Sequence, residues 1–166
     1  MSAKTAIDID GSEAVSAVLL KLLNEFPGLS PGQKVQFATL EDTGGVGVFP
    51  SAGAAIEKEE EDICGHVSQR CLYPFEVFYR SAPKSEAQRL RIKEFLDTLG
   101  KWLERQPVRI NGKEEQLGAY PALGSGNRVI KSISRTAPAH PAAAYQDGVE
   151  DWAMGLRLVY ENEFDR

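Results

Sequence analysis

The chain has few of the residues on which catalysis and metal binding usually depend. Its 166 residues include only two cysteines, Cys64 and Cys71, and two histidines, His66 and His140. The cysteines lack the paired spacing of a zinc site, and nothing in the sequence indicates a disulfide-stapled secreted scaffold. We therefore expect two free thiols in a reducing compartment, with no metal and no cofactor.

The chain also lacks a basic surplus and a long hydrophobic run. Its formal net charge is −5 at pH 7, which disfavours tight binding to nucleic-acid phosphates, although a lumen through which DNA passes without specific binding needs no such surplus. The first ten residues hold no apolar signal region, and no run approaches the roughly 18 apolar residues that span a bilayer. We expect a cytoplasmic protein without a membrane partner, forming one domain over residues 1–166 in which residues 1–9 are flexible.

Apolar residues at three- and four-residue spacing predict two amphipathic helices. The first is expected to be capped by Asp10 or Ser12 and to stop before Pro27, because a proline disfavours helical geometry at the residue before it. The second is expected to begin at the cap Ser85 and to end at Gln106. The apolar positions are Val15, Val18, Leu19, Leu22, Leu23 and Phe26 in the first helix, and Ile92, Phe95, Leu96, Leu99, Trp102 and Leu103 in the second.

Alternating apolar and polar residues predict strands at 34–40, 67–80, 128–136 and 149–162. Pro74 cannot donate a ladder hydrogen bond, so the strand that contains it should bend or have an unpaired side. Because the elements do not alternate as βαβ units, we expect an α+β fold: a mainly antiparallel four- to five-stranded sheet with two main helices packed on one face. The two long strands, 67–80 and 149–162, are expected at its centre.

Three connections rich in glycine, proline and alanine are predicted to be loops, at 43–55, 112–127 and 137–148. The glycine clusters at 44–47 and 124–126 lack the lysine of a phosphate-binding loop, so we interpret them as hinges. We expect all three connections to contact neighbouring chains, since loops that order on docking can form a binding surface.

An acidic run lies between the first loop and the long strand, and its spacing does not match a calcium loop. It is either a solvated face, or a patch that guides assembly or lines a channel through which DNA passes. In the assembly reading, its partners on an adjacent subunit are Arg128, Arg135 and Arg157. The run consists of Glu57, Glu59, Glu60, Glu61 and Asp62.

The only candidate for nucleophilic catalysis is the neighbouring pair Cys64 and His66. Such a pair needs a third group that orients the base and a loop that stabilises an oxyanion, and the sequence indicates neither. We therefore expect the chain not to be an enzyme, and a small cysteine-dependent enzyme remains the alternative.

Four segments carry a resemblance to a known family: NEFPGL, LYPFEVFYRS, RIKEFLDTLGKWLERQ and MGLRLVYEN. In this order they resemble the minor capsid or tail-completion proteins of long-tailed phages and prophages, a family similar to the tail terminators. The resemblance implies a subunit that closes into a hexameric ring on the last ring of the tail tube, stops tube growth and offers a surface for head attachment. The Ala- and Pro-rich stretch at 137–145 departs from the family pattern.

The partners implied by the resemblance are further copies of the chain, the tail-tube protein and a head-completion or connector protein. The implied location is the head-proximal end of the virion tail, after assembly in the host cytoplasm. The alternatives within phage are a head–tail connector or adaptor and a tail-tube subunit, and outside phage a monomeric binding adaptor. The expected interface residues are Val46, Val48, Phe49, Glu57, Glu59, Glu60, Glu61, Arg128, Arg135, His140, Tyr145 and Arg157.

Overall fold

The computed structural model describes residues 11–51, 55–124 and 127–166. The expected flexibility of residues 1–9 and the expected cap at Asp10 lie outside these ranges. In chain order the elements are α1 (Ser12–Asn24), β1 (Val35–Phe37), β2 (Gly45–Pro50), β3 (Ala55–Glu61), β4 (His66–Ser81), α2 (Glu86–Leu103), β5 (Val108–Ile110), β6 (Lys113–Glu115), β7 (Asn127–Ala144) and β8 (Glu150–Asp165).

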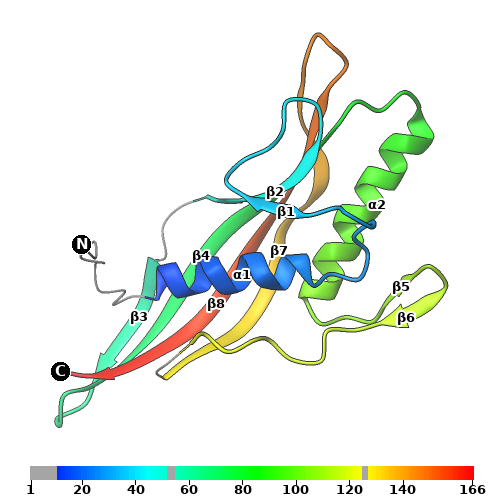
Figure 1. Cartoon of the computed structure of the whole chain (residues 1–166). Helices are drawn as coiled ribbons and strands as arrows, with labels where there is room; N and C mark the ends of the chain where they lie inside the picture. The colour runs from blue at the N-terminus through cyan, green and yellow to red at the C-terminus, as the bar shows by residue number, and fades with distance from the viewer. Residues whose placement is uncertain (1–10, 52–54, 125–126) are drawn as a thin grey trace, which may run out of the picture.

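The main sheet has six strands in the order β1-β2-β4-β8-β7, with β3 also paired to β4 (Figure 1). β1 pairs parallel to β2, whereas the other neighbours are antiparallel. Strands β5 and β6 form a separate two-stranded sheet. The predicted sheet of four or five mainly antiparallel strands is therefore wrong, because the described residues form a six-stranded mixed sheet and a second small one.

The two long strands form the centre of the sheet, as predicted. β4 and β8 pair along their whole length, from His66 opposite Asp165 to Ser81 opposite Glu150. The apolar parity of β4 is also confirmed, since its alternate side chains are buried. These buried residues are Val67, Cys71, Tyr73, Phe75 and Val77.

Pro74 lies where the neighbour of β4 changes. β3 pairs with β4 as far as Leu72, and β2 pairs with it from Phe75 onward. The carbonyl of Pro74 accepts a hydrogen bond from the Ser51 N–H at 3.1 Å on that side. In an antiparallel ladder a residue directs its N–H and C=O to the same neighbour, so the missing N–H of Pro74 faces the gap between β2 and β3. Pro74 therefore lies where the strand pairing on this side of β4 is interrupted.

Both helices bury their apolar sides on one face of the main sheet, in a single core cluster (Figure 1). The Ser85 side chain caps α2 by accepting from the Gln88 N–H, as predicted. The cap predicted at Ser12 is wrong: Ser12 is the first helical residue, and the capping position is Gly11, with φ of 82° and no side-chain cap. α1 ends before Pro27, and the Asn24 side chain bonds to both the N–H and the C=O of Val35, which fixes β1 beside the helix.

The three predicted loops contain regular structure. Residues 45–50 are β2, and residues 137–144 continue β7, which pairs with β8 through several register shifts. A tight hairpin joins β5 to β6 through Asn111 and Gly112, whose φ values of 52° and 77° suit a type I′ turn. The residues at 52–54 and 125–126 lie outside the described ranges.

The prolines of β7 are tolerated because β7 is an edge strand of the sheet. Side chains cap several N–H groups of this strand, each at 3.2 Å, so this part of the edge cannot serve as a template for another strand. The donors and their acceptors are Ile133 with the Tyr120 hydroxyl, Arg135 with Glu104, and Ala139 with Asp97. In the parts of the chain that the structure describes, neither helix combines the length and hydrophobicity of a bilayer-spanning segment.

Candidate functional site

The sheet ends in a projecting region rich in carboxylates, here called the acidic end and made of residues 57–70 and 161–166. Here β3, the start of β4 and the end of β8 extend past α1 (Figure 1). Every residue of β3 is exposed, so the predicted acidic run, apart from Asp62, lies on a solvated strand. Its carboxylates are joined by those of β8, namely Glu161, Glu163 and Asp165.

The carboxylates of the acidic run are paired within the chain. Each of the four glutamates predicted at an interface has a basic partner. The pairs are Glu57 with Arg70 at 2.9 Å, Glu60 with Lys58 at 2.8 Å, and Glu59 and Glu61 with Arg166 at 3.2 and 2.8 Å. Such exposed pairs are individually weak because water and salt screen them, so an approaching chain could exchange them at little cost.

A polar chain crosses four strands at this end and connects two of the predicted interface residues. Glu59 accepts from Gln69 Nε2 at 2.8 Å, Gln69 Oε1 accepts from Asn162 Nδ2 at 3.1 Å, and Asn162 Oδ1 accepts from Arg128 Nε at 3.0 Å. Arg128 is thus linked to the acidic run of its own chain. Gln69 and Asn162 are buried and were missed as functional residues. The sequence did offer a signal for them: each is a polar residue at a position of β4 or β8 where the alternating pattern calls for an apolar one.

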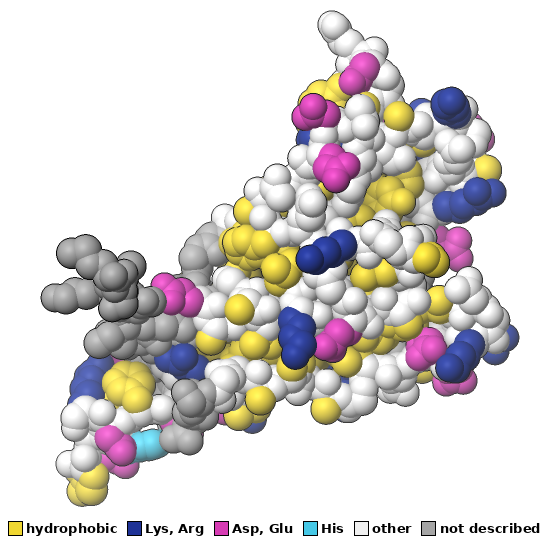
Figure 2. Space-filling view, in the orientation of Figure 1, with side chains coloured by type: hydrophobic (Ala, Val, Ile, Leu, Met, Phe, Trp, Pro, Cys, Tyr) yellow, Lys and Arg dark blue, Asp and Glu magenta, His cyan; other side chains and the backbone are white. Residues whose placement is uncertain are grey.

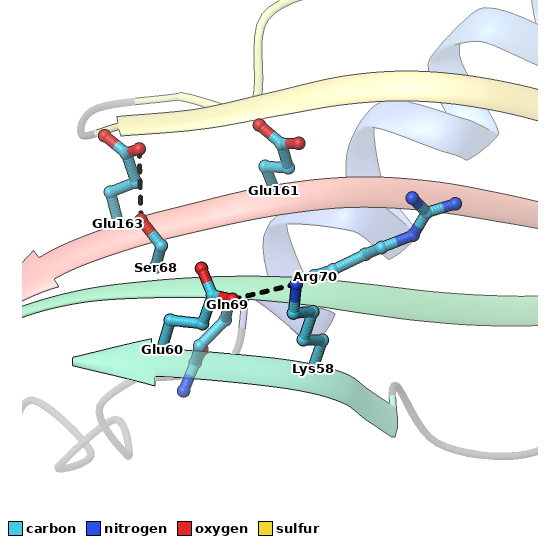
Figure 3. A pocket seen from close by; sticks show the side chains of 7 residues that line it. All are labelled: Lys58, Glu60, Ser68, Gln69, Arg70, Glu161 and Glu163. Carbon is cyan, nitrogen blue, oxygen red and sulfur yellow. Dashed lines mark hydrogen bonds and ion pairs between the residues drawn. The ribbon is translucent and has the colours of Figure 1, made fainter.

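The face of the sheet away from the helices has a shallow pocket at the acidic end (Figure 3). It has a volume of about 310 Å³ and is lined by Lys58, Glu60, Ser68, Gln69, Arg70, Glu161 and Glu163. Its charged groups are already engaged: Ser68 donates to Glu163 at 3.3 Å, and Lys131 pairs with Glu161 at 3.5 Å. The Lys58 ammonium, through its hydrogen bond, lowers the pKa of Glu60. These groups form mutual ion pairs rather than an acid and a base poised for proton transfer.

His66 lies at the start of β4 between two carboxylates of β8. Its Nδ1 is 2.9 Å from Asp165 Oδ1, and its Nε2 is 3.8 Å from Glu163 Oε2. The hydrogen bond to Asp165 raises the pKa of the His66 imidazole. Sequence reasoning missed Asp165 because it is 99 residues away, and only the strand register brings it here.

Cys64 is exposed in the turn before β4, whereas Cys71 is buried. Both ring nitrogens of His66 face carboxylates, so neither is directed at the Cys64 thiol, as the nitrogen of a general base would be. Within the described ranges, no three His, Cys, Asp or Glu side chains are grouped so that they could hold a metal ion.

Two of the predicted interface residues belong to the core. Val46 and Val48 are 1% and 0% exposed, because β2 directs them toward the helices. The prediction that they are exposed in a loop is wrong. Phe49 points to the opposite face of the sheet, where its ring packs edge-to-face on Phe78 with centroids 5.2 Å apart.

The remaining predicted residues lie on β7, on β8 and in the turn between them. Arg135 forms an ion pair with Glu104 at 2.9 Å, so its partner is in its own chain. His140 is exposed on β7, and its Nδ1 is 2.8 Å from the Pro138 carbonyl. Tyr145 is 48% exposed at the turn before β8. Arg157 is exposed on β8, and its side chain forms no ion pair with another described residue, which leaves its guanidinium available to a partner.

Comparison with known proteins gives matches among solved structures but none by sequence. No family model matches the chain, and a search of curated proteins finds no match. A chain from the solved structure "Virion of native gene transfer agent (GTA) particle" is 7% identical, with a TM-score of 0.46 over 95% of this chain and 100% of that chain. A likeness at this level does not assign a function.

Proposed function

We propose that this chain is a structural subunit that assembles with copies of itself into a ring, and that the ring is the tail terminator of a long-tailed phage. In this role the ring caps the tail tube, stops its polymerisation and provides the surface for head attachment. DNA passes through the ring without specific binding. The chain's partners are then its own copies, the tail-tube protein and a head-completion protein. The four-segment resemblance in the sequence supports the phage assignment.

The acidic end is the observation that carries the assembly proposal. β3 is exposed along all seven residues, and among the described strands only β4 pairs with it. The charges of β3 and its bulge between Ile56 and Lys58 disfavour indiscriminate strand pairing, so a partner at this edge must be complementary in charge. Ile56 on β3 and Ile63 in the following turn are 49% and 104% exposed, so apolar surface lies among the charges. A partner that covers this end would remove both apolar side chains from water.

The capped edge of β7 limits how copies can associate. Since side chains occupy three N–H groups in the middle of this strand, repeated pairing of β7 with a sheet edge of the next copy is disfavoured. Association through a different surface can close after a fixed number of copies, as a ring requires.

A catalytic role has less support than assembly. The arrangement of His66 between Asp165 and Glu163 leaves Cys64 without a base, and the pocket beside it is filled by mutual ion pairs. We propose that the chain acts without catalysis and without a cofactor.

Two experiments test the proposed function. The purified protein is examined by light scattering and electron microscopy across a concentration series. A terminator gives single closed rings, a tube subunit gives long stacks, and a monomer at every concentration contradicts self-assembly. Deletion of the gene from the phage that encodes it then tests termination: overlong tails support it, and tails of normal length refute it.

A further inference from the structure

A hydrophobic knob projects from the tip of the acidic end. The turn between β3 and β4 presents Ile63, whose side chain is fully exposed at 104%. The Asp62 carboxylate accepts from the N–H groups of Cys64 and His66 at 2.8 and 3.0 Å, and the Gly65 carbonyl accepts from the Arg166 N–H at 2.8 Å. These bonds fix the turn, so a partner that covers Ile63 has little ordering entropy to overcome. Figure 2 shows this hydrophobic tip with acidic side chains and a histidine beside it.

A pocket lies at the other end of β4, where β4 leads into α2. It has a volume of about 520 Å³ and is lined by Tyr79, Ser81, Ala82, Lys84, Gln88, Arg91, Ile92 and Phe95. The rings of Tyr79 and Phe95 meet edge-to-face with centroids 5.2 Å apart. With Ile92, they form the apolar part of a lining that is otherwise polar. Figure 2 shows hydrophobic side chains beside α2 with basic side chains near them.

The knob and the pocket are complementary in charge as well as in hydrophobicity. The knob is flanked by Glu61 and Asp62, whereas the charged residues of the pocket lining are Lys84 and Arg91, both exposed. The lining contains no carboxylate. An aliphatic side chain with acidic neighbours, one of them paired with Arg166, therefore meets a partly apolar lining with a basic rim. The opposite charges favour encounter and fix orientation.

A single copy cannot fill its own pocket. The 16 residues of β4 separate the two features by roughly 50 Å at the usual rise per strand residue. We propose that the Ile63 turn of one copy docks into the pocket between β4 and α2 of the next copy. This contact joins different surfaces of identical chains, so it is head-to-tail and closes into a ring when the rotation between copies allows. The proposal rests on the self-assembly proposed above and names the surfaces that produce it.

The exposed thiol of Cys64 provides a direct test. In the docked arrangement Cys64 lies beside the rim of the neighbour's pocket, so a Gln88→Cys variant treated with diamide should form disulfide-linked multimers on a non-reducing gel. The matched control is Lys101→Cys, an exposed position at the opposite end of α2. A Cys64→Ser change added to Gln88→Cys should abolish the ladder. Cys71 is buried and does not compete for oxidation.

The outcomes separate this proposal from the proposed function. A yield of disulfide-linked multimers that is well above that of Lys101→Cys supports docking when it is obtained with Gln88→Cys. Equal cross-linking of the two variants in a protein that still forms rings overturns docking and leaves the ring intact. A protein that stays monomeric overturns both.

A second experiment measures the affinity of self-association instead of disulfide cross-linking. Ile63→Asp should weaken self-association roughly tenfold to a hundredfold, because burial of an isoleucine side chain is lost. Val129→Asp, which alters a 53% exposed valine on β7, is the control and should leave association unchanged. An Ile63→Asp protein that associates as tightly as the parent refutes the proposal. Since Ile63 makes no contribution to the core, the variant should fold, which its circular dichroism spectrum checks.

Discussion

Replacing Arg80 by methionine should remove the clamp that holds the turn between β7 and β8 against the rest of the sheet. The Asp151 side chain is 7% exposed, and its carboxylate accepts from Arg80 Nε at 2.7 Å, from Arg80 Nη2 at 2.9 Å and from the Tyr145 hydroxyl at 2.8 Å. The guanidinium also lies 5.5 Å from the centroid of the Tyr145 ring. The substitution keeps the apolar stem and leaves a buried carboxylate without its cation.

The expected loss of stability follows from the burial of this pair. Removing one partner of a buried ion pair costs about 3–5 kcal/mol. The Arg80 side chain is still 21% exposed, so water can partly replace it and we expect a loss of about 3 kcal/mol, at the lower end of that range. Tyr145→Phe removes one hydrogen bond from the same carboxylate and should cost about 1 kcal/mol. Arg157→Met, an exposed arginine without such a partner, should change stability by less than about 0.5 kcal/mol.

Urea unfolding at pH 7 measures these differences, and acid unfolding checks their cause. The hydrogen bond from Arg80 lowers the pKa of Asp151 below its ordinary value of 3.8. A lowered carboxyl pKa contributes stability that is fully present above the ordinary pKa and is lost as the pH falls through the lowered one. The difference between parent and Arg80→Met should therefore be constant near neutrality and should shrink below about pH 4. A variant within about 0.5 kcal/mol of the parent at pH 7, or a gap that widens in acid, would refute the reasoning.

Three further predictions concern other contacts of the fold. The hydrogen bond to Asp165 raises the pKa of His66. The stabilisation from this bond is therefore present below the ordinary pKa of histidine and is lost as the pH rises through the raised pKa. His66→Asn should make the melting temperature less dependent on pH between pH 5.5 and 8.5. Gly100→Ala places a Cβ 2.8 Å from Met154 Sδ, so overpacking should outweigh helix propensity and cost about 1 kcal/mol in urea unfolding. Tyr120→Phe removes the hydroxyl that bridges α2 and β7 and should speed hydrogen exchange at the β7 edge, whereas unchanged exchange would contradict the capping role.

The glycine- and proline-rich segments were the main source of error in predicting the fold. Residues 45–50 and 137–144 contain glycines, prolines and alanines that favour loops locally, yet they are strands. β2 is stabilised by its pairing with β4 and by the burial of Val46 and Val48. β7 tolerates its prolines because it is an edge strand. In both cases the stabilising partner lies far away in the chain, where no local pattern can show it.

The candidate site was predictable only in its composition. The glutamates of the acidic run were identified from the sequence, but Arg166, the partner of Glu59 and Glu61, was not, since it lies about a hundred residues away. Likewise, the polar chain from Glu59 to Arg128 joins β3 and β4 to β7 and β8, and its central bond links residues 93 positions apart.

The sequence by itself determined both helices and the two central strands, because the period of the apolar residues fixes which side of each element is buried. The cap at Ser85 and the interruption at Pro74 are equally local, since each depends on the hydrogen bonds of one or two residues. Only the tertiary structure decided the parallel pairing of β1, the capped edge of β7 and the placement of an apolar knob and a basic-rimmed pocket at opposite ends of β4. These features depend on strand register and on contacts between distant segments, which local propensity does not encode.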